Sequence, residues 1–162
     1  MLRKVRSSGI RVGARPFVIV ASRYNARYVD SLVRAARKTL QDAGARVHVV
    51  RVPGAYEIPL AADLVARRAS AAPASTDRVA AIVCLGVILR GETAHAAHIG
   101  EAVTWALMQI QLRHAIPVIH EVLLLENEAQ AVKRCLHPQH NRGIEAAETA
   151  LQMAKLVQKL HP

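Results

Sequence analysis

The sequence predicts an α/β protein in which helices cover both faces of a four-stranded parallel sheet, a three-layer αβα sandwich. Short apolar runs, typical of buried strands, alternate with longer segments whose apolar residues recur at spacings of three and four, typical of helices. Hydrophobic residues make up 52% of the chain but aromatic residues only 3%. The core must therefore be built from Ala, Val, Leu and Ile, which suits helices packed on a parallel sheet.

Four strands and five helices are expected. The strands are apolar runs at residues 16–22, 46–52, 78–85 and 117–125. The helices are the periodic segments at residues 25–43, 56–68, 95–114, 126–136 and 141–160. Gly44 stops the first helix, and Pro53 with Gly54 ends the second strand. The remaining segments, including 69–76 and 86–94, are expected to be loops.

The chain is long enough for one domain, which we expect at residues 16–162. Residues 1–15 show no hydrophobic periodicity and predict a basic flexible tail or an added edge strand. Arginine and lysine residues interrupt any apolar stretch there, and no segment approaches a membrane-spanning length. A cytoplasmic location without membrane contact is the expectation.

The formal net charge is +10, with a predicted pI of about 10.6. Charge of this size bears on solubility and on the attraction of anions, not on the fold. The basic residues are spread along the chain and few aromatic residues are present to stack on bases, so we expect no specific nucleic-acid partner. An anion- or nucleic-acid-binding assembly is kept as a less favoured hypothesis. A phosphorylated small substrate is compatible with the same charge.

The carboxyl ends of parallel strands are where α/β sheets bind ligands, and this rule selects four segments. These are residues 22–25, 53–57, 86–95 and the segment after residue 125. In the third of them, Gly91 and Thr93 precede a predicted helix whose free N–H groups would favour an anion. Thr93 is equally explained as a helix cap.

His95 follows at the rim of that anion site. A histidine there could take and give a proton near neutral pH, although an exposed histidine at a helix start is a common and unremarkable feature. His98 lies on the same helical face, but no third ligand has suitable spacing, so no metal site is expected. Cys84 and Cys135 are the only cysteines and predict no disulfide framework.

Other polar residues near the strand ends are candidates for ligand binding. Tyr24 could stack on a planar heterocycle and Asn25 could bind its polar edges, or the two could form a plain capping turn. Glu57 could accept hydrogen bonds from a ligand or only complement a helix dipole. Arg134 and Arg142 could hold a phosphate, although helical arginines are usually solvated.

Four segments together resemble the lumazine synthase family: SRYN at 22–25, PGAYEIP at 53–59, RGETAH at 90–95 and NRGIEAAETALQMA at 141–154. They occur in the family's order and with nearly its spacing, and the resemblance covers the chain after about residue 15. It implies a flavodoxin-like fold and a cofactor-free transferase of riboflavin biosynthesis. The implied reaction joins 5-amino-6-(D-ribitylamino)uracil to 3,4-dihydroxy-2-butanone 4-phosphate and yields 6,7-dimethyl-8-ribityllumazine.

The resemblance also implies roles for particular residues. Tyr24 stands at the family's aromatic stacking position, and His95 is the implied acid/base. The pyrimidine and ribityl chain would be held by Asn25, Ala55, Glu57, Ile88 and Leu89. The phosphate would be held by Gly91, Glu92, Thr93 and Arg134, with Arg142 where the family commonly has Lys.

Three departures from the family pattern concern the site and the assembly. Ala96 and Ala97 replace an aromatic and an acidic residue that usually follow the histidine. His120 replaces an aromatic residue that, in the family, covers the active site of the neighbouring subunit, and Pro138 stands in a turn linked to capsid size. The resemblance implies a homo-oligomer of at least five chains. A non-catalytic relative that binds a flavin or a lumazine is the alternative function.

Overall fold

A computed structural model describes residues 9–71 and 78–160. Its centre is a parallel sheet with strand order β2-β1-β3-β4, formed by β1 (Pro16–Ser22), β2 (Arg46–Val52), β3 (Ala81–Leu89) and β4 (Val118–Leu125). Every residue of β1 is buried, as are all residues of β3 except the last, because these two central strands are covered on both faces. The strand order reverses between β1 and β3, which marks the expected ligand crevice.

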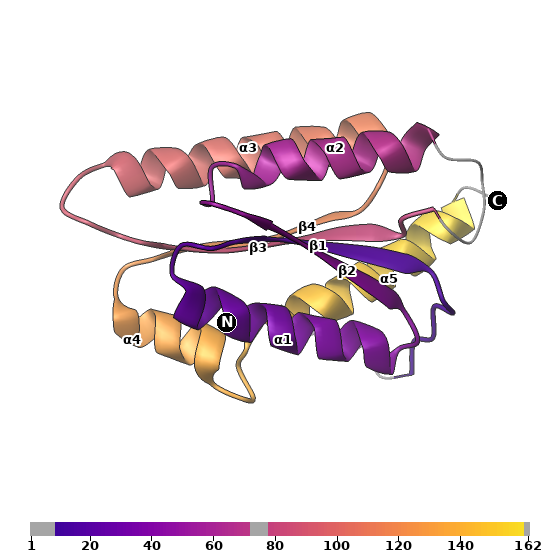
Figure 1. Ribbon diagram of the computed structural model, residues 1–162, viewed down its shortest axis with the longest axis horizontal. Coiled ribbons are helices and arrows are strands. Elements are labelled where there is room, and N and C mark those ends of the chain that lie inside the picture. Colours follow the sequence, from indigo (N-terminus) through magenta and orange to yellow (C-terminus); the bar gives the residue numbers. More distant parts are fainter. Residues whose placement is uncertain (1–8, 72–77, 161–162) are drawn as a thin grey trace.

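Helices form one layer on each face of the sheet (Figure 1). One layer contains α2 (Ile58–Ala71) and α3 (His95–His114). The other contains α1 (Ala26–Asp42), α4 (Glu128–Ala131), the π-helical turn η1 (Val132–Leu136) and α5 (Arg142–Leu160). Two apolar cores, one between the sheet and each layer, hold the sandwich together. The predicted three-layer fold with a four-stranded parallel sheet is confirmed.

Three expectations about the elements need correction. Residues 69–71 were expected in a loop, but α2 continues to Ala71. Residues 86–89 were expected in a loop, but β3 continues to Leu89, where it still pairs with Leu125 of β4. Gly86 serves close packing there, since a Cβ atom would lie 3.0 Å from Val122 and 3.2 Å from Ile58. The single helix expected at 126–136 is a short α-helix followed by the π-helical turn η1.

A small polar cluster ties η1 to α1 and α5. The carbonyl oxygen of Cys135 accepts hydrogen bonds from the Ser31 hydroxyl at 2.7 Å and from the Asn141 side-chain amide. The Asn141 Oδ1 atom in turn accepts the backbone N–H of Gly143 at 2.8 Å. A methyl group on Gly143 would overlap the carbonyl oxygen of Leu32, so this glycine permits the close approach of α1 and α5.

Two exposed apolar surfaces lie on the α2–α3 layer. The first, called the α3 flank, consists of Trp105, Met108 and Leu112 on one stripe of α3 together with Leu124 on β4. The second, called the α2 flank, consists of Tyr56, Leu60 and Leu64. Trp105, Leu60 and Leu112 are each 67% exposed, which is unusual for such large side chains unless a partner covers them.

The predicted tail at 1–15 is only partly described, since residues 1–8 lie outside the described residues. From Gly9 to Arg15 the chain forms turns rather than a strand or helix, and the Val12 N–H donates to the Ala43 carbonyl oxygen at 3.3 Å. Among the described residues, no helix has the length and apolar character to cross a membrane.

Candidate active site

A cavity of about 850 Å³ opens at the carboxyl ends of β1, β2 and β3, where the strand order reverses. Its walls come from the segments after β1 and β2, from the end of β3 and from the first two turns of α3. The lining residues are Tyr24, Asn25, Gly54, Ala55, Tyr56, Glu57, Val87, Ile88, Leu89, His95, His98, Ile99 and Ala102. This volume falls within the range of small-molecule sites.

Asn25 lines the cavity between the ends of the two central strands, β1 and β3. Its backbone adopts the left-handed conformation (φ 56°, ψ 40°), which asparagine tolerates better than most residues. Its side-chain amide donates to the carbonyl oxygen of Val87 at 2.8 Å, which ties the end of β1 to the end of β3. Because the amide nitrogen is used in this way, the amide oxygen is the atom that a ligand N–H or O–H can address.

The Tyr24 ring and the Glu57 carboxylate both contact the backbone of Gly54. The ring of Tyr24 packs against the Gly54 backbone, where an added Cβ atom would lie 3.3 Å from the ring, and 73% of the tyrosine is exposed. The Glu57 carboxylate accepts the Gly54 N–H at 2.8 Å, so it fixes the turn that supports the ring. The segment thus presents an open aromatic face beside a carboxylate, which suits a flat ligand with polar edges.

His95 is the first residue of α3 and is exposed at the rim of the cavity. The cap position is occupied by Ala94, whose side chain cannot bond the first N–H groups of the helix. Thr93 accepts only a long bond of 3.4 Å from the His95 N–H, so the helix cap that was one of the two explanations for this residue is weak. The start of α3 therefore keeps N–H groups available to an anion.

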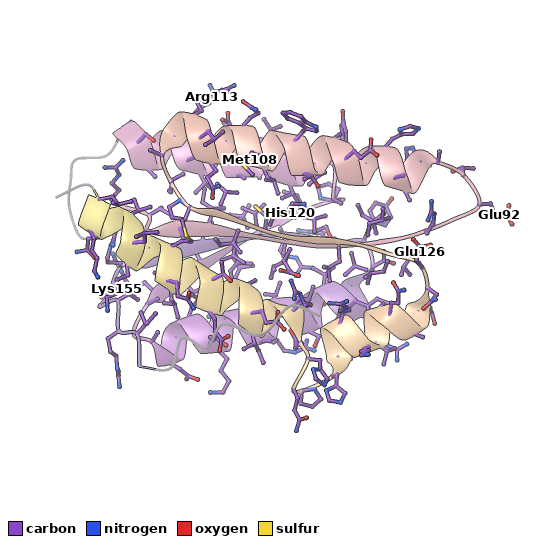
Figure 2. All side chains as sticks on the ribbon, turned by 180° about the vertical axis from the view of Figure 1, so that it is seen from behind. Glu92, Met108, Arg113, His120, Glu126 and Lys155 are labelled. Carbon is purple, nitrogen blue, oxygen red and sulfur yellow. The ribbon has the colours of Figure 1, made fainter. Side chains whose placement is uncertain are left out.

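Gly91, Glu92 and Thr93 lie on the exposed loop before α3 and are not among the residues that line the cavity. An ion pair fixes the start of this loop: the Arg90 guanidinium donates to both Glu126 carboxylate oxygens, at 2.8 and 3.0 Å. Figure 2 shows Glu92 and Glu126 at the same end of the sheet.

His120 lies on β4 (Figure 2) and is not among the residues that line the cavity of its own chain. Two hydrogen bonds hold its ring. The Nδ1 atom accepts the Val122 N–H at 3.1 Å, so Nε2 carries the proton and donates to the Thr104 hydroxyl at 2.8 Å. Burial lowers the pKa of His120 because it disfavours the charged imidazolium.

Arg134 and Arg142 lie in the helical layer on the opposite face of the sheet from α3. The Arg142 guanidinium donates to Glu121 at 2.6 Å and also to Glu145, so two carboxylates already surround its charge. Glu121 is buried, and desolvation raises its pKa despite the opposing effect of Arg142. Arg134 is exposed at the surface of η1.

One chain thus brings together only part of the predicted site. The cavity contains Tyr24, Asn25, Ala55, Glu57, Ile88, Leu89 and His95. It does not contain Gly91, Glu92, Thr93, His120, Arg134 or Arg142.

Sequence reasoning missed several wall residues. Ile99 and Ala102 are among them, and their spacing of four and seven from His95 could have indicated a shared helix face. His98 also lines the cavity, although sequence reasoning considered it only as a metal ligand. Among the described residues, no group of three or more His, Cys, Asp or Glu side chains could hold a metal ion.

The sandwich has a cavity of small-molecule size where its strand order reverses, with an imidazole at the rim that can transfer protons. These features are typical of a flavodoxin-like α/β enzyme that acts on a small molecule. The family model described as 6,7-dimethyl-8-ribityllumazine synthase matches residues 15–158. The chain belongs to this family. The expectation of a transferase of riboflavin biosynthesis is thereby confirmed, and the non-catalytic alternative is not favoured.

Individual relatives agree with the family model. The 6,7-dimethyl-8-ribityllumazine synthase of Xylella fastidiosa (strain 9a5c) is 42% identical over 151 residues, which cover 91% of this chain and 92% of the relative. The enzymes of the same name from Xanthomonas campestris pv. campestris (strain B100) and Stenotrophomonas maltophilia (strain R551-3) are 40% and 41% identical over 147 residues. These matches cover 89% of this chain and 90% of each relative.

Proposed function

We propose that the chain condenses 5-amino-6-(D-ribitylamino)uracil with 3,4-dihydroxy-2-butanone 4-phosphate to form 6,7-dimethyl-8-ribityllumazine. The observation that supports this proposal most directly is the cavity itself, because it combines an aromatic face, a fixed carboxylate and an imidazole at the start of a helix. These are the groups needed to hold a pyrimidine and to move protons beside an anion.

In the proposed complex, the pyrimidine stacks on Tyr24, and its ribityl chain extends along Asn25 and Glu57. The ring amine attacks the ketone carbon of the second substrate, and water leaves as the imine forms. The phosphate then leaves with its bonding electron pair as a proton is removed from the adjacent carbon. His95 serves these two steps, because an imidazole can give a proton to the departing hydroxide and take one from carbon. The enol that remains becomes a ketone, the ribitylamino nitrogen attacks its carbonyl carbon, and a second water leaves as the new ring closes.

The phosphate site is proposed to be completed by a neighbouring chain of a homo-oligomer with at least five subunits. Two observations support this. Arg134 and His120 do not line the cavity of their own chain, and the α3 and α2 flanks expose large apolar side chains that a neighbour can cover. Arg134 is the proposed main phosphate ligand, since Arg142 is already neutralised by Glu121 and Glu145.

The condensation as proposed requires no cofactor, because proton transfers and the departure of one phosphate and two waters account for every step. We also propose a cytoplasmic location, which two free, buried cysteines support. Neither a membrane nor a specific nucleic acid has a place in this function.

The test is an assay of the purified oligomer with both substrates, in which the product is followed by its absorbance and the released phosphate by a coupled assay. The proposal expects one phosphate for each lumazine formed. An intact oligomer that binds the lumazine, measured by fluorescence quenching, but forms no product would instead support the non-catalytic alternative.

A further inference from the structure

An acidic residue, Glu121, interrupts the apolar face of β4 that packs against the α1–α5 layer. Alternate residues of a strand point to opposite faces of the sheet, and Ile119, Leu123 and Leu125 all pack into the core on this side. Glu121 shares their face, and only 6% of it is exposed. Because a buried carboxylate is costly unless polar or charged groups stabilise it, the surroundings of Glu121 must supply such partners.

The main partner is Arg142, the first residue of α5. Its Nε atom donates to Glu121 Oε1 at 2.6 Å, and its Nη2 atom donates to Oε2 at 3.3 Å. Its Nη1 atom donates to Glu145, three residues further along the same helix. All three guanidinium nitrogens thus donate to two carboxylates, which leaves Arg142 little capacity to bind another anion.

The Glu121 carboxylate also acts on η1, where Arg134 lies. Desolvation raises the pKa of Glu121, and the charge of Arg134 is among the effects that oppose this rise. Burial, and after it the charge of Glu121, raise the pKa of the adjacent Cys135 thiol to about 11. Glu121 therefore lies within electrostatic range of η1 while it contacts α5, so the two arginines share one carboxylate.

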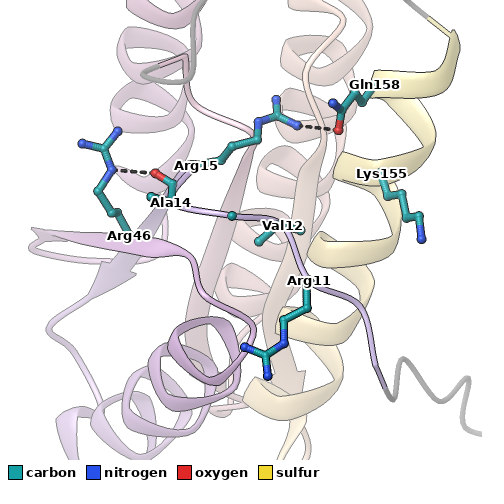
Figure 3. Close-up of a pocket in the computed structure, with 8 residues that line it drawn as sticks. Arg11, Val12, Ala14, Arg15, Arg46, Lys155 and Gln158 are labelled. Carbon is teal, nitrogen blue, oxygen red and sulfur yellow. Dashed lines mark hydrogen bonds between the residues drawn. The ribbon is translucent and has the colours of Figure 1, made fainter.

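Another group of cations shares no such partner. It lines a cavity of about 700 Å³ at the amino ends of β1 and β2 and consists of Arg11, Arg15, Arg46 and Lys155. The three guanidinium groups point in different directions (Figure 3). Arg15 donates to the Gln158 side-chain oxygen at 3.4 Å, and Arg46 donates to the Ala14 carbonyl oxygen at 2.7 Å. Among the described residues of this cavity, the arginines therefore converge on no single point, unlike the pair near Glu121.

We propose that Glu121 is a positioning residue for the phosphate of the second substrate: it holds Arg142 and leaves Arg134 as the one guanidinium that the phosphate can use. This role rests on the proposed function, in which Arg134 of a neighbouring chain binds that phosphate. The same guanidinium must release inorganic phosphate, a product of the reaction. One available arginine instead of two keeps phosphate exchangeable, because a second charge-assisted contact would strengthen the binding of substrate and product alike.

Calorimetric titration of the intact oligomer with inorganic phosphate tests this role without turnover. Glu121→Gln keeps the size of the side chain but removes its charge, so Arg142 retains only Glu145, a partly exposed partner on its own helix. We expect E121Q to bind phosphate roughly 5- to 20-fold more tightly than the wild type. The KM for the butanone phosphate and the inhibition constant of phosphate should fall by a similar factor, whereas kcat should not rise.

A double-mutant cycle shows whether the gain in affinity comes through Arg142. In the Arg142→Gln background, E121Q should add less than about a twofold gain, since the released guanidinium is absent. Glu145→Gln also removes one carboxylate from Arg142; it should give a smaller gain, and it provides the test if E121Q does not fold. Glu128→Gln is the control, because it removes the same charge from an exposed position of α4 and should leave phosphate affinity unchanged.

Unchanged phosphate affinity in E121Q, or in E145Q if E121Q does not fold, would overturn the proposal. An equal gain with and without Arg142 would do so too, as would an equal gain in E128Q, since any loss of negative charge would then suffice. The proposed function fails in a different way. If the wild type formed no lumazine but the variants kept the expected order of phosphate affinities, the proposed reaction would be wrong and the role of Glu121 in phosphate binding would stand.

Discussion

At the rim of the cavity, the His95 ring has no partner among the described residues that would orient it. Ala97 supplies no carboxylate, and no hydrogen bond to the imidazole occurs among the described residues. A histidine oriented only by the helix start can still transfer protons, but it relies on bound substrate for its final position.

We expect His95→Ala to lower kcat by about 10²- to 10⁴-fold, because general acid/base groups contribute this much to catalysis. The KM for the uracil substrate should change little, since Tyr24, Asn25 and Glu57 remain. Steady-state kinetics with both substrates measure the two constants. His98→Ala is the matched control on the same helix, and a comparable loss of kcat in that variant would contradict the assignment of His95.

Tyr24 provides a test of stacking. We expect Tyr24→Ala to weaken binding of the uracil substrate about 10- to 100-fold, because stacking on an aromatic ring stabilises a bound base by about 1–3 kcal/mol. Tyr24→Phe should bind nearly as well as the wild type, since the ring is retained. Equilibrium dialysis with the uracil substrate alone measures both. An equal loss in the two variants would indicate that the hydroxyl, and not the ring, makes the contact.

His120 should make stability depend on pH. Burial lowers its folded-state pKa below the ordinary value near 6.5, so the unfolded chain takes up a proton first as the pH falls. The contribution to the free energy of unfolding is fully present above pH 6.5 and is lost as the pH falls toward the folded-state pKa. Urea denaturation between pH 7.5 and 5.5, at fixed chain concentration, should show a shallower loss for His120→Gln than for the wild type.

The residue types of the site were predictable from sequence, but several of their partners were not. Tyr24, Asn25 and Glu57 follow strand ends, and the rule for parallel sheets places such residues at one edge. The partner of Arg142 could not be predicted in this way, because its guanidinium forms an ion pair with Glu121, which lies 21 residues earlier in the chain. No local pattern reveals such a pair. The dependence of Tyr24 on Gly54 is likewise a matter of tertiary contact.

Among the elements, the four strands follow closely from their apolar runs, whereas the segment after β4 does not. Its periodicity fits one helix at 126–136, but the structure contains α4 and the π-helical turn η1. The physical cause is tertiary: the Cys135 carbonyl oxygen accepts hydrogen bonds from Ser31 and Asn141, and a turn with more residues, closed by i→i+5 hydrogen bonds, accommodates these contacts. Hydrophobic spacing cannot report such contacts.

The contact between α1 and α5 yields a prediction at this scale. Gly143→Ala should lower the free energy of unfolding by about 1–3 kcal/mol, since the added methyl group overlaps the Leu32 carbonyl oxygen and the helices must separate. Urea denaturation measures the change. Gly91→Ala is the control, because nothing lies within 4 Å of its added Cβ atom. Equal stability of the Gly143 variant and the wild type would show that α1 and α5 can shift without cost.

For the whole molecule, the proposed role of the exposed flanks in assembly can be tested together with activity. Trp105→Glu places a charge in the α3 flank and should dissociate the oligomer, because a buried unpaired carboxylate is costly. Light scattering coupled to size exclusion measures the mass, and activity should fall with it, since the proposed phosphate site takes Arg134 and His120 from a neighbouring chain. Leu156→Glu on α5, outside both flanks, is the control. A Trp105 variant that stays oligomeric would place the interface elsewhere.

The two flanks are not alike, and this has a consequence for mixed populations. If the α3 flank of one chain meets the α2 flank of the next, the contact is head-to-tail, and each chain is both donor and acceptor. A chain with a defective α3 flank but an intact α2 flank would still join a growing ring and then stop it from closing. Co-expressed with normal chains, a minority of such chains would inactivate far more sites than their own number.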